Sequence, residues 1–244
     1  MKAFRLNRIF EYGSGRFFGV AFEKYLLDSY DILSGLQIMQ SVSAMGLQVV
    51  QAGVSEALAW RGVTTQGGLL LDVGDAEAIS VPRSCASLVD QALRLDATGI
   101  AISLSDKNSA KDYRAITVLK EQCDRYELPL LMDISKVRAG SRSSPKEVAK
   151  RAVGLGADII KADLRMNQAA IRQAAQGALL VASISSEEAL EDAALLGDSA
   201  VCGLILEQAM LDKLHLAKRM IVGNAAIHVK SGKRKGYLSR GGLR

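Results

Sequence analysis

One lysine stands near the end of a short, mostly apolar run, in the segment 156–164 (GADIIKADL). The run follows a helical pattern and a glycine turn, which is typical of a buried parallel strand. A buried ammonium group is unfavourable unless it is paired with an anion or loses its proton. A lysine whose pKa shifts on burial can become a neutral amine, which is a nucleophile towards carbonyl carbon. Lys161 is therefore the first candidate for chemistry, as a Schiff-base lysine.

The alternative for Lys161 is structural: a lysine at a strand end, with its ammonium group in water or paired with Asp163. The substitution Lys161→Met separates the two hypotheses. If the amine is buried without a structural partner, an apolar side chain of similar length stabilises the fold. If the lysine belongs to a structural ion pair, the same substitution destabilises it.

The elements that position Lys161 follow from hydrophobic periodicity. Eight apolar, strand-like runs alternate with helical patterns, which favours a parallel sheet, and their number and the chain length fit a closed (β/α)8 TIM barrel. An open doubly wound sheet is the other arrangement, but no G-x-G-x-x-G follows the first strand. Strands are expected at 17–22, 47–52, 68–73, 99–104, 129–134, 156–164, 178–184 and 200–206, and helices at 36–45, 55–64, 84–95, 110–126, 145–155, 168–176, 186–196 and 210–222.

Polar residues collect where these strands end, whereas the strand bodies are mostly apolar. In a barrel of this kind the active site is built at the C-terminal ends of the strands. Alternation places Lys161 and Asp163 on one face of their strand. The polar strand ends are Glu23, Gln51, Asp72, Ser103, Ser105, Asp133, Lys161, Asp163, Ser183, Ser185 and Glu207.

Composition narrows the class of protein. The chain has 244 residues, of which 49% are hydrophobic, yet it has no apolar run as long as a membrane span and no apolar core of a signal peptide near its start. We therefore expect a soluble, cytoplasmic protein without a membrane partner. Its three cysteines are far apart and its two histidines isolated, so the sequence implies no disulfide framework, no metal site and no cofactor. The barrel is expected to span residues 1–222.

The net charge of +5 is concentrated in an extension at residues 223–244, which carries six basic residues and no acidic one from Lys230 to Arg244. Such a tail could contact nucleic acid or another anionic surface, lie across a neighbouring subunit, or stay solvated. The chain lacks the aromatic-rich or recognition-helix pattern that accompanies nucleic-acid binding, which argues against that partner. We expect a homo-oligomer.

Several short motifs resemble the archaeal-type class I aldolases, the family that contains class I fructose-bisphosphate aldolase, the autoinducer-2 phospho-sugar thiolase and 2-amino-3,7-dideoxy-threo-hept-6-ulosonate synthase. The start at 5–10 (RLNRIF) is similar to the family's R-L-x-R-I-F, and 145–156 is similar to its D-P-E-x-V-A-x-A…L-G-A segment. The stretch 157–161 (ADIIK) resembles the family's A-D-I-V-K, whose lysine forms the Schiff base. The resemblance spans roughly residues 5–208 and implies a TIM barrel with Lys161 as the nucleophile.

The chain also departs from the family's pattern. Glu23 stands where the family has a catalytic aspartate, and 134–137 (ISKV) replaces the motif with the tyrosine proton donor. The glycine-rich phosphate loop corresponds to 182–185 (ASIS), and Glu207 stands where the family has a phosphate-binding arginine. A carboxylate in that position repels phosphate, so a hexose bisphosphate is not the expected substrate.

The first hypothesis is thus a class I, metal-independent lyase or transferase that acts on a small carbonyl or phosphorylated substrate. Lys161 would form an iminium, and Glu23 or Asp133 would move protons. The alternative for Glu23 is a carboxylate at the barrel mouth that pairs with a lysine. The second hypothesis is a barrel without catalysis that serves in binding or assembly. The remaining candidates are assigned to substrate binding: Asp72, Ser103, Ser135, Lys136, Asp163, Ser183, Ser185 and Glu207.

Overall fold

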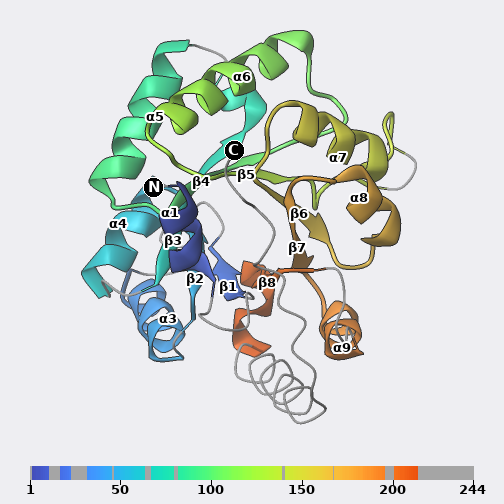
Figure 1. Ribbon diagram of the computed structural model, residues 1–244. Helices are drawn as coiled ribbons and strands as arrows, with labels where there is room; N and C mark the ends of the chain where they lie inside the picture. Colours follow the sequence, from blue (N-terminus) through green and yellow to red (C-terminus); the bar gives the residue numbers. More distant parts are fainter. Residues whose placement is uncertain are drawn as a thin grey trace.

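In the computed structural model the strands form a closed barrel surrounded by helices (Figure 1). The eight strands are parallel and pair in sequence order, and β1 closes the barrel against β8. The expected (β/α)8 architecture is confirmed. The structure describes residues 2–10, 17–22, 32–45, 47–63, 67–79, 82–138, 141–166, 168–195 and 201–213, so Glu23 and the extension at 223–244 lie outside the described residues.

Each expected strand is present, with bounds that differ from the predicted run by a few residues. The strands are β1 Phe17–Ala21, β2 Val49–Ala52, β3 Gly68–Asp75, β4 Gly99–Ser103, β5 Leu130–Asp133, β6 Ile159–Asp163, β7 Leu179–Ile184 and β8 Gly203–Leu206. The helices are α1 Lys2–Ile9, α3 Ile32–Ala44, α4 Val54–Val63, α5 Pro82–Arg94, α6 Ala110–Arg125, α7 Pro145–Gly154, α8 Gln168–Ala174 and α9 Glu187–Leu195, with 3-10 helices η1 Ala76–Ile79 and η2 Gln208–Lys213. Of the predicted helix 210–222, the first residues belong to η2 and the rest lie outside the described residues.

Helix α7 illustrates how local sequence sets an element boundary. The Ser144 side chain accepts from the backbone N–H of Glu147, the Glu147 carboxylate accepts from the backbone N–H of Ser144, and Pro145 occupies the first turn. This capping box satisfies backbone donors that the first turn leaves unpaired. It starts the helix that returns the chain towards β6, the strand that carries Lys161.

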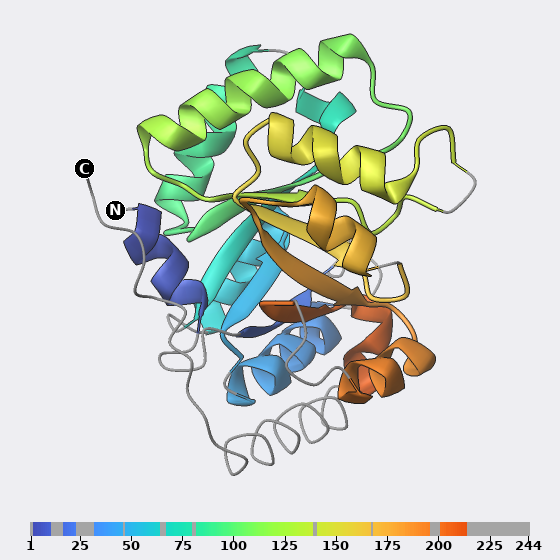
Figure 2. The same ribbon diagram turned by 45° about the vertical axis from the view of Figure 1, so that its right-hand side comes forward.

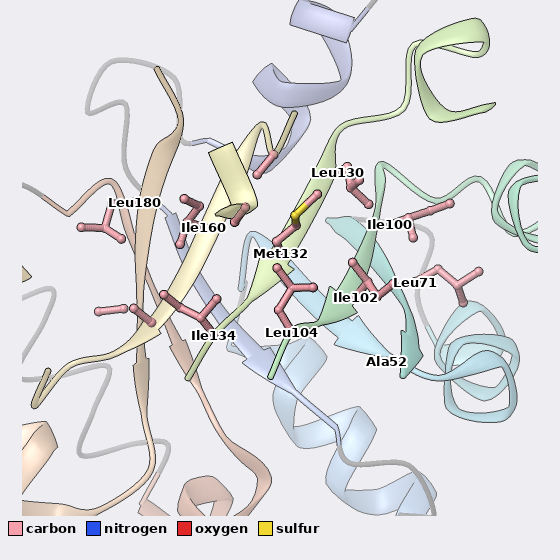
Figure 3. Close-up of a cluster of buried hydrophobic side chains, with 14 of the residues drawn as sticks. Ala52, Leu71, Ile100, Ile102, Leu104, Leu130, Met132, Ile134, Ile160 and Leu180 are labelled. Carbon is pink, nitrogen blue, oxygen red and sulfur yellow. The ribbon is translucent and has the colours of Figure 1, made fainter. Parts of the chain in front are cut away.

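Strand residues alternate between two separate apolar layers. Leu130, Met132 and Ile160 lie in the layer between the strands and the surrounding helices, where Figure 3 shows them beside residues of neighbouring strands. Leu131 and Ile159 lie instead inside the barrel. The alternation follows from the two-residue period of a strand, and burial on both faces explains why the runs are almost continuously apolar.

Inward-facing apolar residues pack together inside the barrel at heights staggered by the strand register, and we call this cluster the apolar layer. Each strand contributes one buried residue: Ala21, Val49, Leu70, Ala101, Leu131, Ile159, Val181 and Ile205. Such layered filling makes the barrel a packed core and not a pore.

Helix α1 covers the N-terminal end of the barrel (Figure 2) and adds Ile9 to this apolar layer. Arg5 donates to the carbonyl of Ala97 and Arg8 pairs with Asp96, immediately before β4. Lys2 lies 2.8 Å from Asp158, the residue before β6. The sequence pattern predicts no helix here, because eight residues with a charged face carry little helical signal of their own. Tertiary contacts therefore hold the segment against the N-terminal end of the barrel.

Candidate active site

A polar layer lies inside the barrel, two residues beyond the apolar layer along the strands. Because a strand returns to the same face every two residues, the apolar residue of each strand from β2 to β8 is followed two residues later by a polar one that also faces inward. We define the polar layer by its described members, which are Gln51, Asp72, Ser103, Asp133, Lys161, Ser183 and Glu207. The predicted polar groups at the C-terminal strand ends therefore face the interior, at heights staggered by the strand register, in which Lys161 pairs with Val181 and Asp72 with Ala101.

Lys161 lies at the centre of this layer, with 1% of its side chain exposed. Its Nζ lies 2.9 Å from Asp133 Oδ2 and 2.7 Å from Glu207 Oε1. It also donates to Gln51 Oε1 at 3.2 Å. Asp133 stands beside Lys161 in the β5–β6 register, whereas Gln51 is on β2, on the far side of the eight-stranded barrel. The lysine thus reaches across the interior and ties three other strands together.

Each partner of Lys161 is itself held by a further group. Asp133 Oδ1 accepts the backbone N–H of Ser135 at 2.8 Å, and the hydroxyl of buried Ser183 donates to Glu207 Oε1. The amide nitrogen of Gln51 donates to Asp72 Oδ2 at 2.7 Å. This last bond turns the amide oxygen of Gln51 towards Lys161. Among the described residues, Lys161 Nζ therefore has three hydrogen-bond acceptors, on Asp133, Glu207 and Gln51.

The network holds Lys161 as an ammonium ion. Burial by itself lowers the pKa of Lys161, but the charges of Asp133 and Glu207 and their hydrogen bonds outweigh it and raise that pKa above its ordinary value. Burial likewise favours a higher pKa for Asp133, yet the charge of Lys161 and the hydrogen bonds from Ser135 lower it overall. Both partners are charged at neutral pH.

The structural alternative for Lys161 named Asp163 or water as its partner, and that pairing is wrong. Asp163 shares the strand but pairs with Arg165 at 3.3 Å and accepts from the Ser185 hydroxyl at 3.3 Å. It stands one step further towards the barrel mouth, where the lysine head does not reach. Asp163, Arg165 and Ser185 thus form a separate polar group at the rim.

The remaining predicted site residues divide by position. Asp72, Ser183 and Glu207 join the network of Lys161, and Ser135 supports it through its backbone. Ser103 is half-buried on the inward face of β4, and Lys136 is exposed. Gln51 is one of the polar strand ends, but the sequence does not predict it as a site residue. The signal that could have found it is its position two residues after Val49, on the inward face of its strand.

Comparison with known proteins places the fold. No family model and no curated protein matches the sequence. Solved structures do match: orotidine 5'-monophosphate decarboxylase from Methanocaldococcus jannaschii in complex with the inhibitor BMP is 13% identical with a TM-score of 0.60, over 86% of this chain and 97% of that one. The fold is a TIM barrel.

Two further structures support the same conclusion. The lyase acting on 2,3-dimethylmalate, a member of the PEP mutase/isocitrate lyase superfamily, is 14% identical with a TM-score of 0.59, over 97% of this chain and 89% of that one. An aldolase named QR15 is 13% identical with a TM-score of 0.57, over 87% of this chain and 99% of that one. At such identities the likeness establishes the fold. In the described part of the chain, no helix combines the length and apolar character needed to cross a membrane.

Proposed function

We propose that this protein is a class I, metal-independent lyase or transferase of the aldolase type, in which Lys161 forms a Schiff base with a small carbonyl substrate. One observation carries the proposal: a single lysine is buried at the centre of the polar layer, with carboxylates at 2.9 and 2.7 Å from its Nζ. Perturbed titratable groups gathered at the C-terminal end of a TIM barrel are the usual setting of catalysis. The sequence around Lys161, which resembles the Schiff-base segment of class I aldolases, supports the same role.

The chemistry follows from the partners of the amine. The nitrogen of Lys161 attacks the substrate carbonyl, water leaves, and a protonated imine forms. That cation accepts the electron pair of a neighbouring carbon–carbon bond as it breaks, or supplies the enamine that forms a new one. Asp133 and Glu207 stabilise the positive charge on nitrogen before and after the imine forms, because both lie within 3 Å of it.

The ammonium group of Lys161 must lose a proton before it can attack the carbonyl. Substrate binding favours this loss, because the substrate removes water from the site. Glu207 has 21% of its side chain exposed, so a substrate bound over it removes water from that carboxylate. Desolvation disfavours the charged forms of both Glu207 and Lys161. Proton transfer between them replaces two buried charges by two neutral groups, so substrate binding favours the nucleophilic amine.

The charge of the polar layer restricts the substrate. Its described members include three carboxyl side chains, on Asp72, Asp133 and Glu207, and one amine. An anionic group next to the reacting carbonyl would face this negative excess. We therefore propose that the reacting end of the substrate is an uncharged aldehyde or ketone that carries hydroxyl groups, and that any phosphate or carboxylate lies further out.

Reductive trapping tests the proposal directly. Glycolaldehyde and dihydroxyacetone are incubated with the protein and cyanoborohydride, and the adduct is located by peptide mass spectrometry. We expect one dominant adduct, at Lys161, which disappears in Lys161→Ala. Lys150→Ala is the matched control, because Lys150 is an exposed lysine on α7 and should leave the adduct unchanged. Modification spread over surface lysines, with none at Lys161, would defeat the proposal.

The raised pKa of Lys161 favours a second candidate in which the lysine stays charged. A fixed ammonium group at the centre of the site would stabilise an enolate or carbanion formed by deprotonation or decarboxylation, without a covalent intermediate. Trapping separates the two functions, since this candidate predicts no adduct at Lys161. It also predicts that Lys161→Ala abolishes exchange of substrate C–H protons with deuterated water.

A further inference from the structure

The three hydrogens of the Lys161 ammonium group each have a defined acceptor. An ammonium group has three donors and no acceptor. Asp133, Glu207 and Gln51 take them at 2.9, 2.7 and 3.2 Å. When one of these hydrogens leaves as a proton, the nitrogen lone pair lies along the line to the group that took it. The acceptor of the proton therefore sets the direction from which a carbonyl carbon can be attacked.

The three directions differ in access. Asp133 has 7% of its side chain exposed and Gln51 is buried, so a lone pair aimed at either one faces the packed interior. Glu207 has 21% of its side chain exposed and stands at the end of β8, where the chain leaves the barrel. A substrate carbonyl can approach the nitrogen beside the Glu207 carboxylate without displacing packed side chains.

The hydrogen-bond partners of the two carboxylates also favour Glu207 over Asp133 as the proton acceptor. Asp133 accepts a backbone N–H from Ser135, which it cannot lose without breaking local structure, and its pKa is lowered by Lys161 and Ser135. It is a fixed anion. Glu207 accepts on Oε1 from both Lys161 and the Ser183 hydroxyl. A hydroxyl can turn to follow a carboxyl group that gains or loses a proton.

We infer that Glu207 is the catalytic acid and base of the Lys161 reaction, and that the carbonyl substrate approaches the amine from the side of Glu207. The inference rests on the proposed Schiff-base function. It departs from the expectation that Glu23 or Asp133 moves the protons and that Glu207 binds substrate. In this arrangement Asp133 keeps the nitrogen in place and stabilises its positive charge, while Gln51, held by Asp72, anchors the third hydrogen.

The steps balance with Glu207 as the sole proton carrier. Glu207 takes a proton from the ammonium group, and the neutral amine adds to the carbonyl carbon while the carbonyl electrons move to oxygen. Glu207 returns its proton to that oxygen and takes a second one from nitrogen, which leaves a neutral carbinolamine. It then protonates the departing hydroxyl, which leaves as water as the nitrogen lone pair forms the C=N bond. The net change is ammonium plus carbonyl to protonated imine plus water.

Chemical rescue tests the assignment. The rate of reductive trapping of glycolaldehyde at Lys161 is measured in the full-length wild type, Glu207→Ala, Asp133→Ala and Glu121→Ala, with and without added formate. Glu121 is an exposed carboxylate on α6 and serves as the matched control. We expect Glu207→Ala to slow trapping by at least about 100-fold and formate to restore it at least tenfold, because general acid–base catalysis contributes on the order of 100- to 10,000-fold. Formate should not rescue Asp133→Ala, whose cavity is closed to solvent.

Each result has a defined meaning. Trapping that is unchanged in Glu207→Ala, or rescue by formate in Asp133→Ala and not in Glu207→Ala, overturns the role of Glu207 while Lys161 remains the nucleophile. Absence of any wild-type adduct overturns both the inference and the Schiff-base function. If Glu207→Ala melts at a much lower temperature than wild type, Glu207→Gln replaces it: an unchanged trapping rate in that variant overturns the inference, and a 100-fold loss without a loss of folding supports it.

Discussion

Replacing Lys161 by methionine tests whether the lysine belongs to an ion-pair network or is an unpaired buried amine. In Lys161→Met the carboxylate of Asp133, 7% exposed, loses its counter-ion, and Glu207 loses one of its partners. Breaking a buried ion pair by removing one member destabilises a protein by about 3–5 kcal/mol. For an unpaired lysine, the methionine was expected to stabilise the fold. Because the structure pairs Lys161 with two carboxylates, we expect Lys161→Met to destabilise it.

In Lys161→Met, Asp133 can take up a proton once its counter-ion is gone. This protonation limits the loss of unfolding free energy and makes the loss depend on pH. Relative to an unfolded aspartate of pKa about 3.9, protonation requires about 4 kcal/mol at pH 7 and about 1.5 kcal/mol at pH 5. In the wild type the pKa of Asp133 is lowered and that of Lys161 is raised, so the pair contributes stability between about pH 4 and pH 10. In the variant, burial without the lysine raises the pKa of Asp133, so stability falls as pH rises. The gap between the two proteins should grow from pH 5 to pH 7.

Urea denaturation at pH 5 and pH 7 measures this gap. We expect Lys161→Met to lose about 3–4 kcal/mol of unfolding free energy at pH 7 and no more than about 1.5 kcal/mol at pH 5. Lys150→Met, at an exposed position on α7, is the control and should change stability by less than about 0.5 kcal/mol at either pH. A variant as stable as wild type at pH 7, or a loss that is equal at both pH values, would refute the ion-pair network.

Three further predictions concern other parts of the molecule. Fructose 1,6-bisphosphate should be a poor substrate, because Glu207 repels phosphate at the end of β8; rapid triose phosphate release in a coupled assay would contradict this. Ile9→Ala should destabilise the barrel by about 2–5 kcal/mol in thermal or urea melts, since Ile9 is fully buried against the apolar layer; a loss below about 1 kcal/mol would mean that α1 does not close the barrel. Removal of residues 230–244 should lower the mass of a homo-oligomer or its melting temperature, as measured by light scattering and calorimetry; no change in either would leave the tail as a solvated end or a site for another anionic partner.

The local sequence pattern was sufficient to predict most of the strands and helices of the barrel. The strand β6 and the helix α7 before it could be predicted because alternation, the Ser144–Glu147 capping box and apolar runs are properties of neighbouring residues. The same reasoning singled out Lys161 and the polar strand ends. It did not find α1, whose few residues become helical through contacts of Ile9, Arg8 and Lys2 with segments far along the chain.

The charge state and partners of Lys161 were decided by tertiary structure. Gln51 is 110 residues away from Lys161 in sequence, and its amide reaches the lysine because barrel closure sets β2 across the interior from β6. Glu207 arrives from β8, and Asp133 from the neighbouring β5. Sequence periodicity tells which face of a strand a residue occupies, but not which residues on other strands meet it at that level. The energy of a buried charge depends on distances of about 3 Å between such residues, so the sequence identified the lysine and its face, and the closed barrel determined that it is held as an ammonium ion.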